Sequence, residues 1–228
     1  MSQAGAEAAL SRQVDEQARI REQTAALRCA CYAAWSELTA SPHEVDTRDS
    51  LQDKRGAGGA LGYGAGLDAL IDEYLGRDPV ELKREYSGLF EIGSDGPPVP
   101  IREDLQTGQR AGTREDLVRF HDYFGYALSQ NFAWQPDHLS VELEFMHYLC
   151  YREATAESDA LTFQLAQVDF AERHLLNWIG RPCDAVQEIA AGSLYARILS
   201  LLMAFVAADV AWQRETICVS EQGQGESS

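Results

Sequence analysis

A proline-opened, leucine-rich segment, Trp134–Cys150, is the feature that most constrains how this chain can fold. Pro136 fixes its own φ and biases the residue before it away from the helical region, and Asp137 can accept hydrogen bonds from the free N–H groups of a first turn. The segment therefore predicts a helix that begins here. Wound at about 100° per residue, it has apolar side chains around most of its circumference. We expect a helix largely surrounded by protein, with one narrow polar stripe made of Ser140, Glu144, His147 and Tyr151.

Two polar residues, His138 and Glu142, interrupt the apolar arc of this helix. They are four positions apart, so they stack on one side, and a carboxylate among leucines needs a partner because burying an unpaired charge is costly. One interpretation is structural: the two side chains satisfy each other or anchor a neighbouring loop. The other is functional: they form a polar patch at the helix entrance that receives a ligand.

The charge balance restricts the possible partners. The chain has 228 residues, 36 acidic against 19 basic, and a formal net charge of -17. Such a surface repels phosphate backbones and anionic lipid headgroups, so we expect no nucleic acid and no membrane as partner, and cationic partners are favoured. The longest apolar run, Ile198–Ala208, is well short of the roughly 18 residues that span a bilayer. No basic region precedes an apolar stretch at the N-terminus, so a cytoplasmic location is expected.

Helical periodicity recurs along the chain and strand-like alternation does not. Helices are predicted over residues 11–38, 67–75, 79–90, 113–128, 137–151, 158–179 and 193–214. A glycine-rich stretch within residues 43–66 predicts a mobile loop, and residues 91–105 predict a long, stiff loop with three prolines. The fold class is all-α: one domain of about eight to ten helices over residues 1–215, with residues 1–10 frayed, residues 216–228 a flexible tail, and a monomer favoured.

No pattern in the sequence indicates catalysis or a cofactor. Glu144 and His147 have the E-x-x-H spacing of di-iron bundles, but such a site needs a second copy and both residues lie on the polar stripe. The glycine stretch lacks a phosphate-binding spacing, and no G-x-S-x-G is present. We therefore predict a binding protein that is not an enzyme and holds no metal or cofactor. A helical metal-dependent enzyme and a small-ligand-binding regulator remain the alternatives.

Several short motifs together resemble one known family. Tyr86, Leu89 and Phe90 form Y-x-x-L-F, the proline loop follows, Pro136-Asp137-His138 opens the central helix, and residues 174–178 form H-L-x-x-W. In this order, across roughly residues 80 to 180, the chain resembles the TorD/DmsD/NarJ family of redox-enzyme maturation chaperones. Residues 99–102 lack the aromatic side chains usual after the prolines. This departure resembles the branch that serves type II enzymes of the dimethyl-sulfoxide-reductase family, such as selenate and chlorate reductases.

The resemblance implies a cytoplasmic chaperone that binds the apo catalytic subunit of a molybdenum enzyme and any twin-arginine signal peptide, and that withholds export until the cofactor is inserted. A twin-arginine leader offers two guanidinium groups followed by an apolar stretch, so its receptor needs acidic groups beside an apolar groove. We expect Asp137 and Glu142 to receive the arginines and His138 to orient the two carboxylates. The remaining predicted client-binding residues are Tyr86, Leu89, Phe90, Pro97, Pro98, Val99, Ile101, Trp134 and Pro136.

Overall fold

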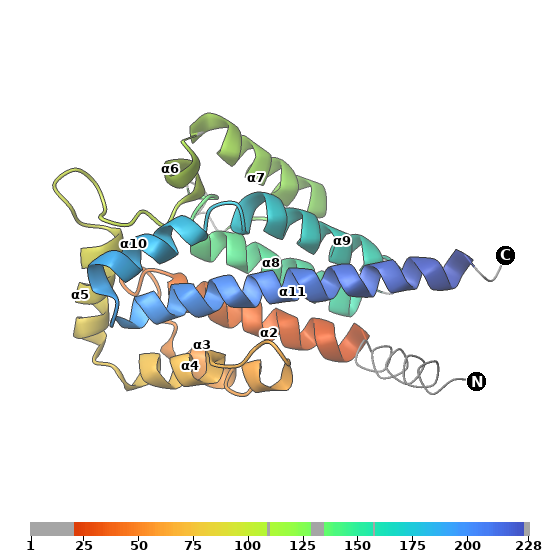
Figure 1. Ribbon diagram of the computed structural model, residues 1–228, viewed down its shortest axis with the longest axis horizontal. Helices are drawn as coiled ribbons and strands as arrows, with labels where there is room; N and C mark the ends of the chain where they lie inside the picture. The colour runs from red at the N-terminus through yellow and green to blue at the C-terminus, as the bar shows by residue number, and fades with distance from the viewer. Residues whose placement is uncertain (1–20, 109, 129–134, 157, 226–228) are drawn as a thin grey trace.

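The computed structural model describes residues 21–108, 110–128, 135–156 and 158–225, and this part of the chain is built from ten α-helices with no strand. The all-α prediction is confirmed. Three long helices form the centre and lie along the long axis of the molecule (Figure 1): α2 (Arg21–Thr39), α8 (Leu139–Thr155) and α11 (Leu194–Gly225). The start of the first predicted helix, the predicted frayed end and Trp134 lie outside the described residues. Whether residues 216–228 are flexible stays a prediction, although α11 extends beyond Arg214, where we expected the helix to end.

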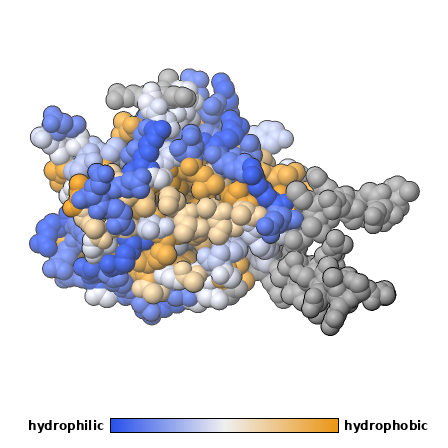
Figure 2. Space-filling view, viewed as in Figure 1, coloured by the Kyte–Doolittle hydropathy of each residue, from blue (hydrophilic) through white to orange (hydrophobic). Residues whose placement is uncertain are grey.

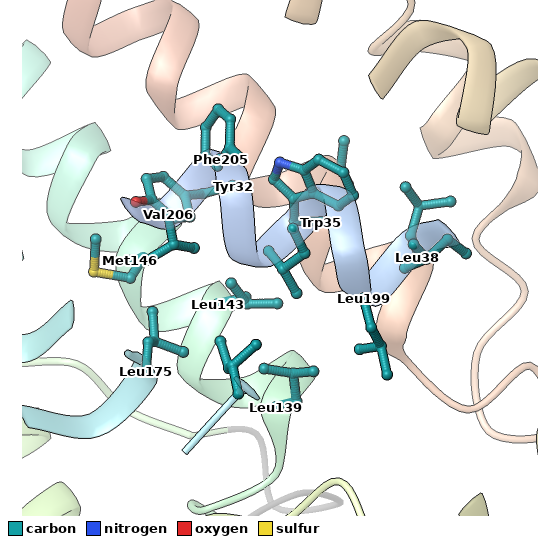
Figure 3. Packing of buried hydrophobic residues seen from close by; sticks show 14 of the residues in the cluster. Tyr32, Trp35, Leu38, Leu139, Leu143, Met146, Leu175, Leu199, Phe205 and Val206 are labelled. Atoms are coloured by element: carbon teal, nitrogen blue, oxygen red, sulfur yellow. The ribbon is translucent and has the colours of Figure 1, made fainter. Parts of the chain in front are cut away.

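Aromatic and aliphatic side chains from these three helices meet in one continuous core (Figure 3). Leu139, Leu143 and Met146 of α8 point toward Tyr32, Trp35 and Leu38 of α2, while α11 contributes Leu199, Phe205 and Val206. All nine are buried, which explains why apolar residues cover most of the circumference of the central helix. The core therefore fixes α8, and with it the His138 end of that helix, relative to the rest of the domain.

The first half of the chain wraps this centre with α3 (Arg48–Asp53), a 3-10 turn (Gly58–Ala60), α4 (Leu67–Gly76) and α5 (Pro79–Phe90). Asp78 caps α5 as predicted, since its Oδ1 accepts from the backbone N–H of Val80 and Glu81. The glycine-rich stretch within residues 43–66 follows α3 and forms turns and the 3-10 turn, as expected of a loop, and its mobility stays a prediction. The backbones of Gly58 and Gly64 approach so closely that a Cβ on Gly64 would lie 2.2 Å from the Gly58 oxygen.

The proline loop, residues 91–102, crosses the start of α8, and we call it the strap. The later part of its backbone is tied to two helices, because the Val99 N–H donates to the Leu89 oxygen of α5 at 2.9 Å and the Leu139 N–H of α8 donates to the Ile101 oxygen at 3.1 Å. Two helices follow it, α6 (Glu103–Thr107) and α7 (Arg110–Phe124). Thr113 lies inside α7, so the predicted capping role of this residue was wrong.

The predicted helix over residues 158–179 is interrupted. α9 (Ala160–Phe170) passes into a π-helical turn (Ala171–Leu175), and Gly180 begins α10 (Gly180–Ala190) rather than ending the previous helix. Pro182 lies in the first turn of α10, where its missing N–H would have no intrahelical partner. Gly180 and Pro182 therefore mark the start of a helix. The prediction that a helix ends at Gly180 was wrong.

One helix, α11 over Leu194–Ile217, is long and apolar enough to cross a membrane by length and composition. Within its most apolar window 56% is buried inside the protein, and core helices of soluble proteins meet the same criterion. Figure 2 shows apolar side chains gathered over α9 and α11 at the centre of this face, bordered by hydrophilic surface.

Candidate functional site

Two hollows adjoin at His138 and together form what we call the His138 groove. The larger, of about 490 Å³, lies between α2, the turn at residues 41–47 and α8. The smaller, of about 310 Å³, lies under the strap. Ser41, Glu44, Gln135 and His138 line both hollows, so the two are continuous at the amino end of α8.

His138 is the N-cap residue of α8, so the helix begins one residue beyond it and Asp137 does not cap it. The His138 Nδ1 accepts from the Ser140 N–H at 3.2 Å and lies 2.8 Å from the Ser140 hydroxyl, while Nε2 lies 3.5 Å from the Tyr86 hydroxyl. Burial and the nearby Arg102 guanidinium lower the pKa of His138 to about 4. At neutral pH the groove therefore presents a neutral imidazole, and the predicted pairing of His138 with Glu142 was wrong.

Asp137 is fully buried beneath the groove and already has cationic partners. Its Oδ1 lies 3.0 Å from Nη2 of Arg102 in the strap and 3.1 Å from Nε of Arg114 in α7. The neighbouring Asp104 also pairs with Arg114, at 3.1 Å, and burial together with Asp137 raises the pKa of Asp104 to about 6. Asp137 thus joins the strap and α7 to the start of α8. A leader arginine cannot reach it in this structure, contrary to the prediction.

Glu142 is also fully buried, on the core side of α8. Its Oε2 accepts from Nε1 of Trp178 at 3.1 Å, and Glu103, which faces it, contacts Nδ1 of His174 at 3.0 Å. Burial and the Glu103 carboxylate raise the pKa of Glu142 well above its usual range, which favours the protonated form of this carboxyl. It cannot receive an arginine from outside. The H-L-x-x-W motif instead supplies both polar partners of this buried acid pair.

The other predicted site residues divide into two groups. Tyr86, Phe90, Pro97 and Ile101 line the hollow under the strap together with His138. Leu89, Pro98, Val99 and Pro136 line neither hollow of the groove. Val99 of the strap and Pro136 are buried, so their place is in the packing that supports the groove. The apolar side of the groove is therefore made of fewer residues than the sequence suggested.

The sequence reasoning missed most of the acidic residues of the groove. Glu91 is held by the hydroxyls of Ser41 and Ser87 at 2.8 and 2.7 Å, and Glu37 pairs with Lys54 at 2.8 Å. The side chain of Glu44 forms no ion pair with any residue that the structure describes. With Glu144 of the polar stripe, the groove has four carboxylates and two basic side chains, and both basic groups are engaged, Lys54 by Glu37 and Arg102 by Asp137. Only the strongly negative net charge and the polar stripe signalled this surface.

The groove contains no arrangement suited to a metal. Glu144 and His147 both line its larger hollow, one turn apart on α8. Nδ1 of His147 is occupied by the Cys29 carbonyl oxygen at 2.9 Å. Within residues 21–108, 110–128, 135–156 and 158–225, no three His, Cys, Asp or Glu side chains are grouped so that they could hold a metal ion. What the groove offers is an acidic surface beside an apolar strap.

Sequence comparison gives the family of this all-helical chain with its acidic groove. The model of the family described as "Nitrate reductase delta subunit" matches residues 60–184, more than half of the chain. The protein belongs to this family of TorD/NarJ-type redox-enzyme maturation chaperones, as the motifs predicted.

The similar curated proteins are named as assembly chaperones. The chlorate reductase assembly chaperone protein of Ideonella dechloratans is 38% identical over 49% of this chain and 60% of its own length. The selenate reductase assembly chaperone protein of Thauera selenatis is 36% identical over 48% of this chain and 58% of its own length. The chain thus matches about three fifths of these relatives. A crystal structure described as a redox enzyme maturation protein from Archaeoglobus fulgidus aligns with a TM-score of 0.46 and 18% identity, covering 83% of this chain and 94% of that one.

Proposed function

We propose that this protein is a cytoplasmic assembly chaperone that binds the apo catalytic subunit of a molybdenum oxidoreductase, including any twin-arginine leader, before cofactor insertion and export. The observation that carries the proposal is the continuous acidic groove around His138, with the apolar strap on one side. Relatives named for chlorate and selenate reductases support the choice of client class. Catalysis is not part of this role.

The groove chemistry suits a cationic segment followed by apolar residues. Glu44 and Glu144 are exposed carboxylates on the larger hollow, where guanidinium groups can form charge-assisted hydrogen bonds with them. Phe90, Ile101 and the partly exposed Leu105 provide the apolar contact under the strap. The deeper acids keep the strap in place and contact no ligand.

A synthetic leader peptide tests the proposal directly. The probe carries two consecutive arginines followed by a leucine- and alanine-rich stretch, and fluorescence anisotropy measures its affinity. The Glu44→Gln/Glu144→Gln variant should bind it about 2- to 30-fold more weakly, since an exposed ion pair contributes about 0.2–1 kcal/mol. Glu188→Gln, which removes one exposed acid from α10 outside the groove, is the charge control and should bind as the unmodified protein does.

Two results would contradict the groove assignment. One is equal loss of affinity in the groove variant and in the Glu188 control, which would mean that only net charge matters. The other is unchanged binding when the two arginines of the peptide are replaced by glutamine. Affinity should also fall with added salt, because exposed charges are screened over about 10 Å at 0.1 M ionic strength.

A further inference from the structure

A separate groove, on another part of the molecule, differs from the His138 groove in both shape and charge. It lies between α7 and α9, has a volume of about 580 Å³, and we call it the α7–α9 groove. Figure 1 shows α7 as an outlying helix beside α9 and away from α2. None of the family motif residues lines it, and its Arg173 comes from the π-helical turn, directly before the H-L-x-x-W motif.

The floor of the α7–α9 groove is aromatic and its edge leaves large apolar side chains in solvent. Phe120 and Phe124 stack with ring centroids 6.4 Å apart, and Tyr123 contacts Phe124 edge-on at 4.8 Å. Tyr123 is 79% exposed and Leu165 on the opposite wall is 46% exposed. A tyrosine this exposed gains little from packing within its own chain, whereas tyrosine is enriched among the residues that dominate the energy of protein interfaces.

The rims of this groove carry equal numbers of acidic and basic groups. On α7, Asp116 pairs with Arg119 at 3.2 Å; on the α9 side, Asp169 pairs with Arg173 at 3.4 Å. Each pair lies within one helical segment, and none of the ion pairs in the described part of the chain crosses the groove. Exposed pairs of this kind are weak and can exchange for partners on another molecule.

From these observations we infer that the α7–α9 groove binds an amphipathic helix of a partner protein, with an apolar stripe flanked by charges of both signs. A helix lays its apolar face into a hydrophobic groove, and here one Asp and one Arg on each wall complement Lys and Glu on the two flanks of the helix. A cationic leader is not favoured, because the rim charges cancel. A second copy is not favoured either, because two chains of net charge -17 repel each other. The inference does not depend on the role of the His138 groove.

The test uses a defined probe, a fluorescent amphipathic peptide of about 18 residues with leucine at helical spacing and glutamate and lysine on its flanks. Tyr123→Ser and Leu165→Ser should each weaken binding by about 10-fold or more. Val118→Ser is the matched control, because Val118 is a 42% exposed apolar residue of the same helix that does not line the groove. It should change the affinity by less than about 2-fold. A peptide of the same composition without helical spacing should not bind.

The inference would be overturned by equal binding of the amphipathic probe and the peptide without helical spacing, or by equal loss of affinity in Val118→Ser and Tyr123→Ser. It would also be overturned by a dimer in sedimentation that Tyr123→Ser dissociates, because the occupant would then be a second copy of the chain. The Glu44→Gln/Glu144→Gln variant separates the two proposals. It should bind the amphipathic peptide normally, and the twin-arginine peptide should not displace that probe. Loss of binding in this variant, or competition between the peptides, would assign both probes to the His138 groove and refute the separate site.

Discussion

Replacement of Arg28 by methionine should be among the most destabilising single changes in this protein. The Arg28 guanidinium is fully buried in α2 and binds Glu153 of α8 and Gln167 of α9, while its Nε lies 3.9 Å from Asp209 of α11. One side chain thus links four helices. Methionine has a similar length but no charge, so Arg28→Met leaves two buried carboxylates without their cation.

The magnitude follows from the loss of a buried cation. Asp209 keeps the hydroxyls of Tyr32 and Tyr63 at 2.8 and 2.6 Å, and the partners that Glu153 keeps include the Gln167 amide at 2.8 Å. Removing one member of a buried ion pair costs about 3–5 kcal/mol. For a chain of this size each kcal/mol lowers Tm by roughly 2–4 °C, so we expect a decrease of about 6–20 °C.

Urea unfolding followed by circular dichroism measures this loss. Arg28→Met/Glu153→Gln should recover part of it, because the second change removes a buried carboxylate that Arg28 binds. Arg119→Met, at a side chain that is 74% exposed, should cost less than about 1 kcal/mol. A loss below about 1 kcal/mol, or a double variant no more stable than the single one, would refute this account.

Three further predictions concern buried or crowded groups. Burial lowers the pKa of His121 to about 4, so below about pH 6.5 the unfolded chain binds more protons than the folded one, and the free energy of unfolding should fall by at most about 3 kcal/mol between pH 6.5 and pH 4. His121→Leu should remove this pH dependence, measured by urea unfolding at about pH 6.5 and pH 4. Because burial raises the pKa of Glu142, the unmodified protein should lose stability as the pH rises above the unfolded value of about 4.3, and Glu142→Gln should remove that loss, measured by unfolding at pH 5 and 8. Gly64→Ala should cost about 1–3 kcal/mol in thermal unfolding because its Cβ would lie 2.2 Å from the Gly58 oxygen, whereas Gly62→Ala, with no atom within 4 Å, should be neutral.

Local signals explain which parts of the fold could be predicted. Asp78 and Pro79 fix the start of α5 through bonds to neighbouring residues, so the sequence alone is sufficient there. The glycine segment required a contact between Gly58 and Gly64, two backbones that no local propensity brings together. The π-helical turn at Ala171–Leu175 is equally invisible to a 3.6-residue period, although it places His174 against Glu103.

The same distinction explains the errors at the site. The sequence identified Glu142 as an acid that needs a partner and assigned Asp137 to the helix start, but the partners of both come from distant segments: Arg102 and Arg114 for Asp137, and Trp178 for Glu142. A receptor carboxylate and a structural carboxylate are the same residue type in a sequence. Only burial separates them, and burial is a property of the assembled fold.

The geometry assigns different tasks to neighbouring residues of the Pro-Asp-His motif. Pro136 and Asp137 are buried, and Asp137 binds the strap through Arg102, whereas His138 faces both hollows of the groove. Because the Ile101–Leu139 backbone bond and the Asp137–Arg102 pair hold the same stretch of strap, loss of Asp137 should displace Ile101 and disturb the groove indirectly. Loss of His138 should alter the groove surface while the strap stays in place. Asp137→Asn and His138→Gln can therefore both weaken client binding, but only the first should increase hydrogen exchange at the Val99 and Glu103 amides.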